Sequence, residues 1–171
     1  MLKVLGGVLV TVGSSMIGFY SAAGLYSHIK VLSCIIHTLR YMKSEISFTL
    51  TPIPDLMEHL AIREKGAVGE FFSRCNSALT ALGTKSFGEI WSECVDGTLK
   101  DVLKEDEIQT FKSLGELLGR YDSEEQAIGI DRETERFVFY LQRAEQEKAR
   151  LGKLYGAMGV LCGIAVVIIL I

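Results

Sequence analysis

The fold is decided by residues 122–158, which read DSEEQAIGIDRETERFVFYLQRAEQEKARLGKLYGAM. Between Asp122 and Ile171 there is no proline to interrupt a helix. Positions spaced alternately by four and three residues form a heptad seam: Ala127, Ile130, Thr134, Phe137, Leu141, Ala144, Lys148, Leu151, Tyr155 and Met158. A helix from Ser123 to Ile171 would be about 73 Å long. Such a helix would carry the bundle rigidly into a membrane. The alternative is an amphipathic helix of the bundle that ends at the bilayer, and we prefer this interpretation for residues 123–145.

Helical spacing also marks the chain before this stretch. An apolar face recurs at helical intervals between Ile29 and Ile46. Thr51 is expected to cap a short second helix, with Pro52 and Pro54 in its first turn. These two are the only prolines of the chain, and no segment shows the alternation of a strand. The pattern therefore favours long helices throughout.

Glycines and capping residues divide the middle of the chain into further helices, and the single tryptophan, Trp91, falls on the core face of one of them. A third helix is expected between Gly66 and Gly69 on one side and Gly83 on the other, and a Ser86–Glu89 capping box is expected to start a fourth. A fifth helix is expected from about Glu105 to Leu118, where Gly119 stops it, and Asp122 is expected at the start of the sixth. The predicted fold is all-α, an antiparallel helical bundle of about six helices.

The two ends of the chain are apolar and uncharged, from Val4 to Ser27 and from Leu154 to Ile171. As helices these runs measure about 36 and 27 Å, against about 30 Å of hydrocarbon. We expect a transmembrane helix in residues 1–27, a helical bundle in 28–152 and a second transmembrane helix in 153–171, the first and last bundle helices extending into the spans. The alternative for the first run is a signal peptide cleaved near Ser21. The chain would then be an exported regulatory or adhesion domain with a C-terminal anchor.

Basic residues near the predicted spans set the expected orientation. Lys30, Arg40 and Lys43 follow the first run, and a second basic group precedes the other. Because positive charge near a span favours the inner side, the bundle is expected to face the cytoplasm. The residues of the second group are Arg143, Lys148, Arg150 and Lys153.

Small residues recur on one stripe of each predicted span. Gly152, Gly156, Gly159 and Gly163 follow one another at intervals of four, three and four residues, and Ser14, Gly18 and Ala22 at intervals of four. Such stripes let helices approach closely in lipid. They are expected either to pack the two spans together or to support self-association into a homo-oligomer.

No pattern typical of catalysis is present. The net charge of −3 argues against a nucleic-acid binder. The four cysteines are widely spaced, without a C-x-x-C pair or a histidine at ligand spacing, so we expect no metal and no cofactor. Phosphate-loop and nucleophile-elbow motifs are also missing. The sequence therefore predicts a non-enzymatic protein.

Acidic residues outnumber basic ones between Glu89 and Glu135. They are expected to lie on solvated helix faces and caps. As a second interpretation, five of them form a surface that could dock a basic partner: Glu105, Asp106, Glu107, Glu124 and Glu125.

Short stretches spread along the whole chain match one known family in order and spacing. These stretches are Met1-Leu2-Lys3 with Leu5-Gly6, Leu39, Glu45-Ile46, Thr51-Pro52, Trp91, Leu117-Leu118-Gly119, Asp122, Gln126, Leu154-Tyr155 and Gly159-Val160-Leu161. Through them the whole chain resembles the stage III sporulation protein AB family of endospore-forming bacteria. Ser27-His28 departs from the Arg-Pro that family members often carry after the first span.

The resemblance implies a role that the residues alone do not predict. Such proteins sit in the mother-cell membrane around the forespore and look like a reduced platform protein F of type II secretion and type IV pilus systems. The expected partners are therefore the bilayer, a secretion-type ATPase and other sporulation channel subunits. Leu118, Gly119, Asp122 and Gln126 match a signature of the family, and we interpret them first as a helix stop and the next helix cap.

Overall fold

The computed structural model describes residues 24–120 and 122–170, without the side chains of residues 119, 120 and 152–170. Two compact units are distinguished. The helical unit is Lys30–Leu141, and the terminal unit combines Met1–Ile29 with Gln142–Ile171. The predicted division at residues 27 and 153 concerns the membrane and stays a prediction.

The elements are all helical. A helix over residues 24–44 leads directly into the π-helix η1 (Glu45–Thr49). It is followed by α2 (Ile53–Arg63), α3 (Gly66–Ala78), the short 3₁₀ helix η2 (Leu79–Ala81), α4 (Phe87–Thr98), α5 (Glu105–Arg120) and α6 (Ser123–Leu170). Within residues 24–120 and 122–170 the only β-type pairing is an isolated bridge between Leu82 and Lys85. The predicted all-α fold is confirmed.

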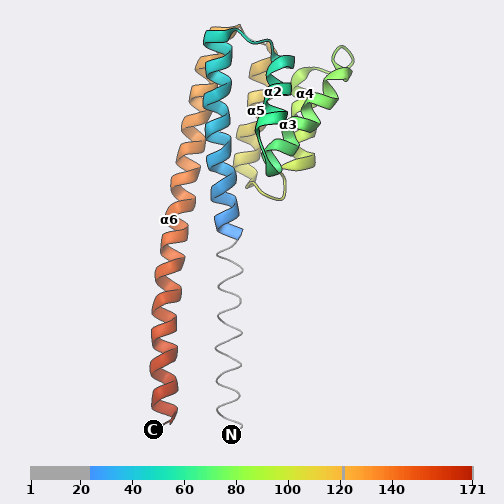
Figure 1. Cartoon of the computed structure of the whole chain (residues 1–171). Helices are drawn as coiled ribbons and strands as arrows, with labels where there is room; N and C mark the ends of the chain where they lie inside the picture. The colour runs from blue at the N-terminus through green and yellow to red at the C-terminus, as the bar shows by residue number, and fades with distance from the viewer. Residues whose placement is uncertain (1–23, 121, 171) are drawn as a thin grey trace. The chain divides into compact units, whose positions relative to one another are not determined.

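Inside the helical unit, α3 packs against both α2 and α4, and α4 packs against α5 (Figure 1). The helices α5 and α6 run antiparallel. Near the end of α5, Leu117 lies beside Gly129, and near its start the Thr110 hydroxyl lies 3.1 Å from that of Tyr140. Because the Thr110 hydroxyl already donates to the Asp106 carbonyl, Tyr140 is the donor in the second contact.

Aromatic side chains form the core of this unit. Phe71 of α3 meets Trp91 of α4 at 4.7 Å between ring centroids, and Trp91 meets Phe111 of α5 at 5.2 Å. Phe111 in turn contacts Phe137 of α6 at 6.0 Å. All four side chains are buried. Burying a side chain of this kind stabilises the fold by roughly 1.5–3 kcal/mol, so this row of rings links the four helices.

Three of the five heptad-seam positions of α6 in the helical unit are buried, and the other two, Ala127 and Leu141, are half-buried. Ile130, Thr134 and Phe137 are nearly inaccessible to solvent, as the spacing predicts. A second row, Gln126 and Glu133, is buried beside it. The helix therefore buries a face wider than a two-helix seam, because more than one helix packs against it.

The predicted cap of α2 is wrong. Pro52 occupies the N-cap position of α2 and supplies no side-chain cap. The Thr51 hydroxyl instead donates to the Glu45 carboxylate at 2.7 Å. The hydrogen bond of Thr51 therefore stabilises the turn after η1, where Leu50 adopts a left-handed conformation with φ 54° and ψ 36°.

Two predicted helix ends also shift. The third helix ends at Ala78 and passes into η2, so Gly83 does not end it but lies in the following turn with φ +104°. The fifth helix runs one residue past Gly119 to Arg120, a difference within the usual uncertainty of helix ends. Gly69 lies inside α3, where a Cβ would stand 2.7 Å from the Glu64 carbonyl carbon.

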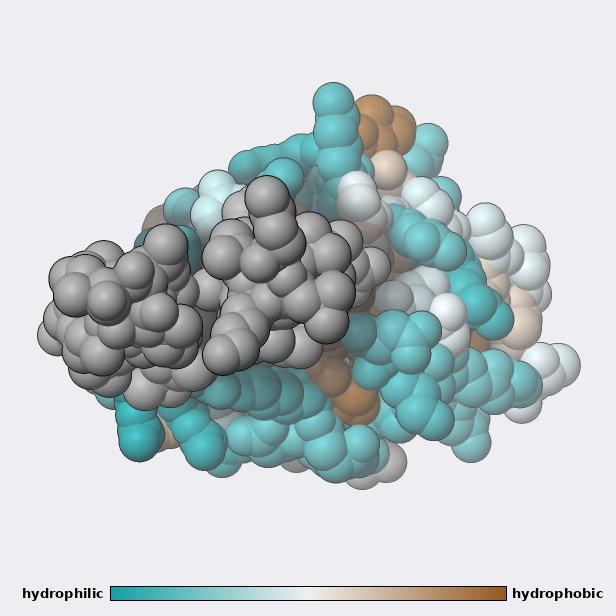
Figure 2. Space-filling model, turned by 90° about the horizontal axis from the view of Figure 1, so that it is seen from below, coloured by the Kyte–Doolittle hydropathy of each residue, from teal (hydrophilic) through white to brown (hydrophobic). Residues whose placement is uncertain are grey.

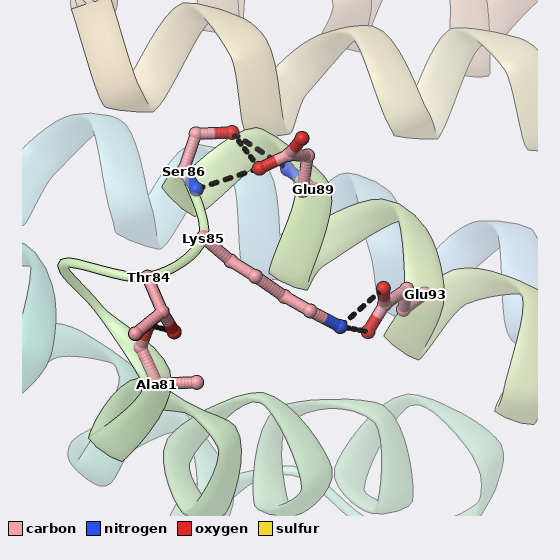
Figure 3. Close-up of polar contacts among 6 residues, drawn as sticks. All are labelled: Ala81, Thr84, Lys85, Ser86, Glu89 and Glu93. Atoms are coloured by element: carbon pink, nitrogen blue, oxygen red, sulfur yellow. Dashed lines mark hydrogen bonds and ion pairs between the residues drawn. The ribbon is translucent and has the colours of Figure 1, made fainter.

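The predicted capping box of α4 is confirmed (Figure 3). The main-chain N–H of Glu89 donates to the Ser86 hydroxyl at 3.3 Å, and the N–H of Ser86 donates to the Glu89 carboxylate at 2.7 Å. Beside it, Lys85 forms an ion pair with Glu93 at 2.6 Å. These contacts fix the start of α4 after the turn.

In the part of the chain that the structure describes, no helix combines the length and hydropathy that a membrane crossing requires. The first predicted span, residues 4–27, lies outside this part except for its last four residues. The side chains of the second predicted span, residues 154–171, also lie outside it. Both spans stay predictions.

Candidate functional site

The five predicted acidic residues do not form one surface. Glu105 and Asp106 are exposed in the first turn of α5, whereas Glu124 and Glu125 are exposed in the first turn of α6. Because α5 and α6 run antiparallel, these two pairs lie at opposite ends of the helix pair. Each pair stands at a helix N-terminus, where negative charge is favoured by the helix dipole.

The expectation of a solvated Glu107 is wrong. Its side chain is only 2 % exposed, and its carboxylate accepts a hydrogen bond from the Lys104 main-chain N–H at 2.8 Å. Glu107 is thus the third residue of α5 and reaches back to the residue before the helix. This contact is half of a capping box, so Glu107 stabilises the start of α5 and offers no surface to a partner.

The family-signature residues form the connection between α5 and α6. The buried side-chain amide of Gln126 donates to the Leu118 carbonyl at 3.2 Å. The Asp122 carboxylate accepts from the Glu125 main-chain N–H at 2.9 Å, which makes Asp122 the N-cap of α6. These contacts agree with the structural interpretation of Leu118, Asp122 and Gln126. Gly119 lies within α5, and its surroundings are outside the described residues.

The small-residue stripes cannot be placed at the level of side chains. Ser14, Gly18 and Ala22 lie outside the described residues, and Gly152, Gly156, Gly159 and Gly163 lie on the part of α6 whose side chains are not described. Next to these stripes, within the terminal unit, the Lys148 ammonium stands 4.8 Å from the ring centroid of Tyr26. This cation–π contact joins Tyr26, at the end of the first predicted span, to Lys148, which precedes the second.

A strip on α6 was missed by the sequence reasoning. Ile128 and Phe139 are 64 % and 61 % exposed, and between them lie the exposed side chains of Arg132 and Arg136. We call these four residues the α6 strip. They are spaced by four, four and three residues, so they share one face of the helix. These four residues lie outside the heptad seam. They form a second periodic pattern on the same helix, which the sequence analysis missed.

Two hollows flank the strip. A groove of about 380 Å³ lies between α5 and α6, lined by Ser113, Glu116, Leu117, Glu125, Ile128, Gly129 and Arg132. A second hollow, of about 480 Å³, is lined by Arg132, Glu135, Arg136, Phe139 and Tyr140. Arg132 borders both. On the face drawn in Figure 2, outside the grey residues, hydrophilic side chains predominate and hydrophobic residues form only small, separate patches.

A buried carboxylate holds the two arginines. Glu133 is 3 % exposed, and its two oxygens lie 3.1 Å from Nε of Arg132 and 3.1 Å from Nη1 of Arg136. The expectation that the carboxylates are solvated is therefore wrong for Glu133 as well. Arg132 donates a hydrogen bond to this carboxylate, Arg136 is held by the ion pair alone, and the two side chains remain 64 % and 55 % exposed. The rest of each fork is available to a ligand.

The cysteines in the described residues are free thiols. Cys75 of α3 and Cys94 of α4 are buried, and the hydrogen bond between them, together with burial, raises the pKa of Cys75, while the same hydrogen bond lowers the pKa of Cys94. Burial and the neighbouring Glu64 carboxylate raise the pKa of Cys34 to about 11. No group of three or more potential metal ligands occurs among the described residues. The thiols of Cys34 and Cys75 are therefore protonated at neutral pH, and buried thiols of this kind pack as small apolar side chains.

Comparisons with known proteins indicate one family. The stage III sporulation protein AB of Bacillus subtilis (strain 168) is 25% identical over 171 residues, which cover 99% of both chains. A solved structure of a stage III sporulation protein AB superposes with a TM-score of 0.65 at 22% identity, covering 72% of this chain and 98% of that one. This likeness shows the helical fold. The model of the stage III sporulation protein AB family matches residues 3–171, and the chain belongs to that family.

Proposed function

We propose that this protein is a non-enzymatic membrane scaffold in a sporulation-specific, secretion-like channel complex between mother cell and forespore. The observation that supports it most directly is the match of the sporulation family over residues 3–171, which includes both uncharged ends. The helical unit would then be carried between two membrane helices, from residues 1–27 and 153–171. Its location would be the mother-cell membrane around the forespore.

The chemistry of the helical unit is consistent with a scaffold. Its buried polar groups serve structure: Glu107 caps α5, Gln126 binds the turn between α5 and α6, and the Trp91 indole donates to the Phe111 carbonyl. The exposed surface of the unit is formed by the outer faces of its helices. Such a unit acts by binding other proteins, with recognition spread over exposed side chains.

Membrane anchoring is proposed from the sequence. The run from Val4 to Ser27 and the run from Leu154 to Ile171 carry no charge, and each is long enough for about 30 Å of hydrocarbon when helical. Basic residues adjoin both runs on the side of the helical unit, which favours the cytoplasm for that unit. The small-residue stripes would pack the two spans together or support a homo-oligomer.

The proposed partners are a secretion-type ATPase and other channel subunits. The resemblance to the platform protein F of secretion systems supports the ATPase as a partner. Two exposed acidic pairs, Glu105 with Asp106 and Glu124 with Glu125, offer separate sites for basic partner surfaces. Exposed charges of this kind act mainly on association rate and specificity.

The test is carried out in the native sporulating host. The full-length tagged chain is followed by fractionation, then extracted in mild detergent and probed for the cognate ATPase after crosslinking. We expect membrane association and recovery of the ATPase, weakened by E105K/D106K or by E124K/E125K but not by the control E58K, an exposed position on α2. A chain that stays in the aqueous fraction, or that never recovers the ATPase while recovering other membrane proteins, contradicts the anchoring or the docking respectively.

A further inference from the structure

The α6 strip combines features that an ordinary solvated helix face lacks. Ile128 and Phe139 are large apolar side chains exposed by 64 % and 61 %. They stand at the two ends of a strip with Arg132 and Arg136 at its centre. Aromatic residues and arginine are the types enriched at the energetic centres of protein interfaces.

The arginines are held in place before any ligand arrives. Nε of Arg132 donates a hydrogen bond to one Glu133 oxygen at 3.1 Å, and Nη1 of Arg136 forms an ion pair with the other oxygen at the same distance but without hydrogen-bond geometry. Because Glu133 is 3 % exposed and lies on the same helix, it fixes both side chains close to α6. Holding a side chain in this way lowers the entropy lost on binding. One carboxylate shared by two guanidinium groups leaves an excess of N–H donors, while Glu135 in the second hollow offsets the second positive charge.

The shape beside the strip suits a helix. The groove of about 380 Å³ follows the contact between α5 and α6, where Gly129 lets Leu117 lie against the helix and gives the groove an apolar floor. It meets the second hollow, of about 480 Å³, at Arg132. Ile128 and Phe139 are eleven residues apart, about 16 Å along the axis, or three helical turns. A partner helix laid along the strip could cover both.

Charged side chains define the chemistry of the partner. The groove between α5 and α6 is lined by the carboxylates of Glu116 and Glu125 together with Arg132, and the second hollow is lined by both arginines and by Glu135. The arginines therefore recognise a ligand by the geometry of their N–H donors rather than by net charge. A carboxylate can receive two parallel N–H donors from one guanidinium. The complementary segment therefore has an acidic side chain at the arginines and a basic side chain toward the carboxylates of the groove.

We propose that the α6 strip docks an amphipathic helix of another protein, with an aspartate or glutamate at Arg132 and Arg136 and apolar side chains over Ile128 and Phe139. A basic side chain of the same helix lies toward Glu116 and Glu125. The inference rests on the proposed scaffold role and adds to it the surface and the chemistry of the partner.

The experiment uses a photoreactive amino acid in the full-length chain in sporulating cells. It replaces Phe139 in one variant, Ile128 in a second, and Ile62 of α2, which is 76 % exposed, in a control. We expect one crosslinked protein from the strip and none above background from Ile62. Mass spectrometry should place the crosslink in a helical segment with the acidic and basic side chains described. R132E/R136E should lower the yield about tenfold or more, and changing the partner's acidic residue to lysine should restore it.

A second variant separates binding from folding. R132K/R136K keeps the charge but removes the planar fork, so it should weaken crosslinking less than R132E/R136E while leaving the circular dichroism spectrum unchanged. Crosslinks to a second copy of this chain, to lipid, or to a segment without an acidic side chain overturn the inference, as does a yield that charge reversal leaves unchanged.

The outcome also distinguishes the strip from the scaffold role. A further photoreactive position, Phe48 in η1, is 84 % exposed and lies outside the strip. If Phe48 crosslinks to a channel subunit and the strip does not, the docking surface is wrong and the scaffold role stands. If no position crosslinks to any other protein, both are wrong.

Discussion

The indole N–H of Trp91 donates a hydrogen bond of 2.7 Å to the main-chain carbonyl of Phe111, inside the core of the helical unit. The two rings also contact each other at 5.2 Å between centroids. A tryptophan can be fully buried at low cost when its N–H has such a partner. The contact ties α4 to α5 by packing and by hydrogen bonding at once, and it depends on how closely α5 approaches.

That approach requires glycine at position 115. A Cβ at Gly115 would stand 2.6 Å from Cδ1 of Trp91, whereas a Cβ at Gly88 would stand 3.4 Å from Glu116. We expect G115A to lower the free energy of unfolding by about 1–3 kcal/mol, and G88A to change it by less than about 0.5 kcal/mol. Denaturation of the full-length chain in mild detergent, followed by Trp91 fluorescence, measures both. Equal effects of the two substitutions would contradict the close contact.

The stability that the start of α4 contributes to the fold should depend on pH through the ionisation of Glu89. Hydrogen bonds from the Ser86 main-chain N–H and hydroxyl hold the pKa of Glu89 below its usual value of 4.5. Because the folded pKa is the lower one, the ionised carboxylate stabilises the fold above pH 4.5, and this contribution is lost as the pH falls through the folded pKa. The wild type should be more stable than E89Q at pH 7, and the difference should shrink toward pH 3.

Two further variants check this capping box. S86A should lower the free energy of unfolding by about 1 kcal/mol at pH 7, because it removes the acceptor for the Glu89 N–H. E58Q removes an exposed carboxylate of α2 and serves as the control. A stability difference between wild type and E89Q that stays constant from pH 7 to pH 3, or that E58Q reproduces, would exclude a special role of Glu89.

Thiol chemistry offers a test of the contact between the helix over residues 24–44 and Glu64. The Cys34 thiol donates to the Glu64 carboxylate at 3.4 Å, and its pKa is raised to about 11. At pH 8 about one thiol in a thousand is then ionised, so alkylation should be roughly a hundredfold slower than for an ordinary cysteine. The rate should rise about tenfold per pH unit up to pH 11.

Replacing Glu64 should accelerate this alkylation. E64Q removes the negative charge that opposes ionisation and so lowers the pKa of Cys34, although burial, the largest cause, remains. E58Q, on the same helix region but away from the thiol, is the matched control. Peptide mass spectrometry reads Cys34 separately from the other cysteines. An unchanged rate in E64Q would mean that the carboxylate does not face the thiol.

Local signals in the sequence predicted much of this fold. The Ser86–Glu89 capping box and the burial of Trp91 follow from spacing alone, because each depends on residues within one or two helical turns. Glu107 was missed because Lys104 is not a residue that normally precedes a capping glutamate. The sequence signal for this contact is a glutamate at the third position of the predicted helix, which the sequence analysis interprets as a surface charge.

The α6 strip was missed for a different reason. Whether a face of a helix is covered depends on how many helices pack around it, which the periodicity of one segment does not state. Glu133 reads as a solvated charge beside the seam, yet packing buries it with two arginines as partners. Conversely, the large apolar side chains of Ile128 and Phe139, for which the heptad seam makes no prediction, are exposed. Tertiary packing decides both cases.

The turn after η1 stores backbone strain that a single substitution should release. Leu50 has φ 54°, which costs a residue with a Cβ roughly 1 kcal/mol or more, and its side chain is 67 % exposed, so little packing depends on it. Leu82, in the turn before α4, is 44 % exposed but has φ −58°. Glycine relieves strain only at the first position, whereas at the second it adds chain entropy to the unfolded state. We therefore expect L50G to raise the free energy of unfolding by up to about 1 kcal/mol and L82G to lower it by about 0.5–1 kcal/mol. Opposite shifts of the two denaturation midpoints, measured side by side on the full-length chain, confirm the left-handed turn, and shifts of the same sign exclude it.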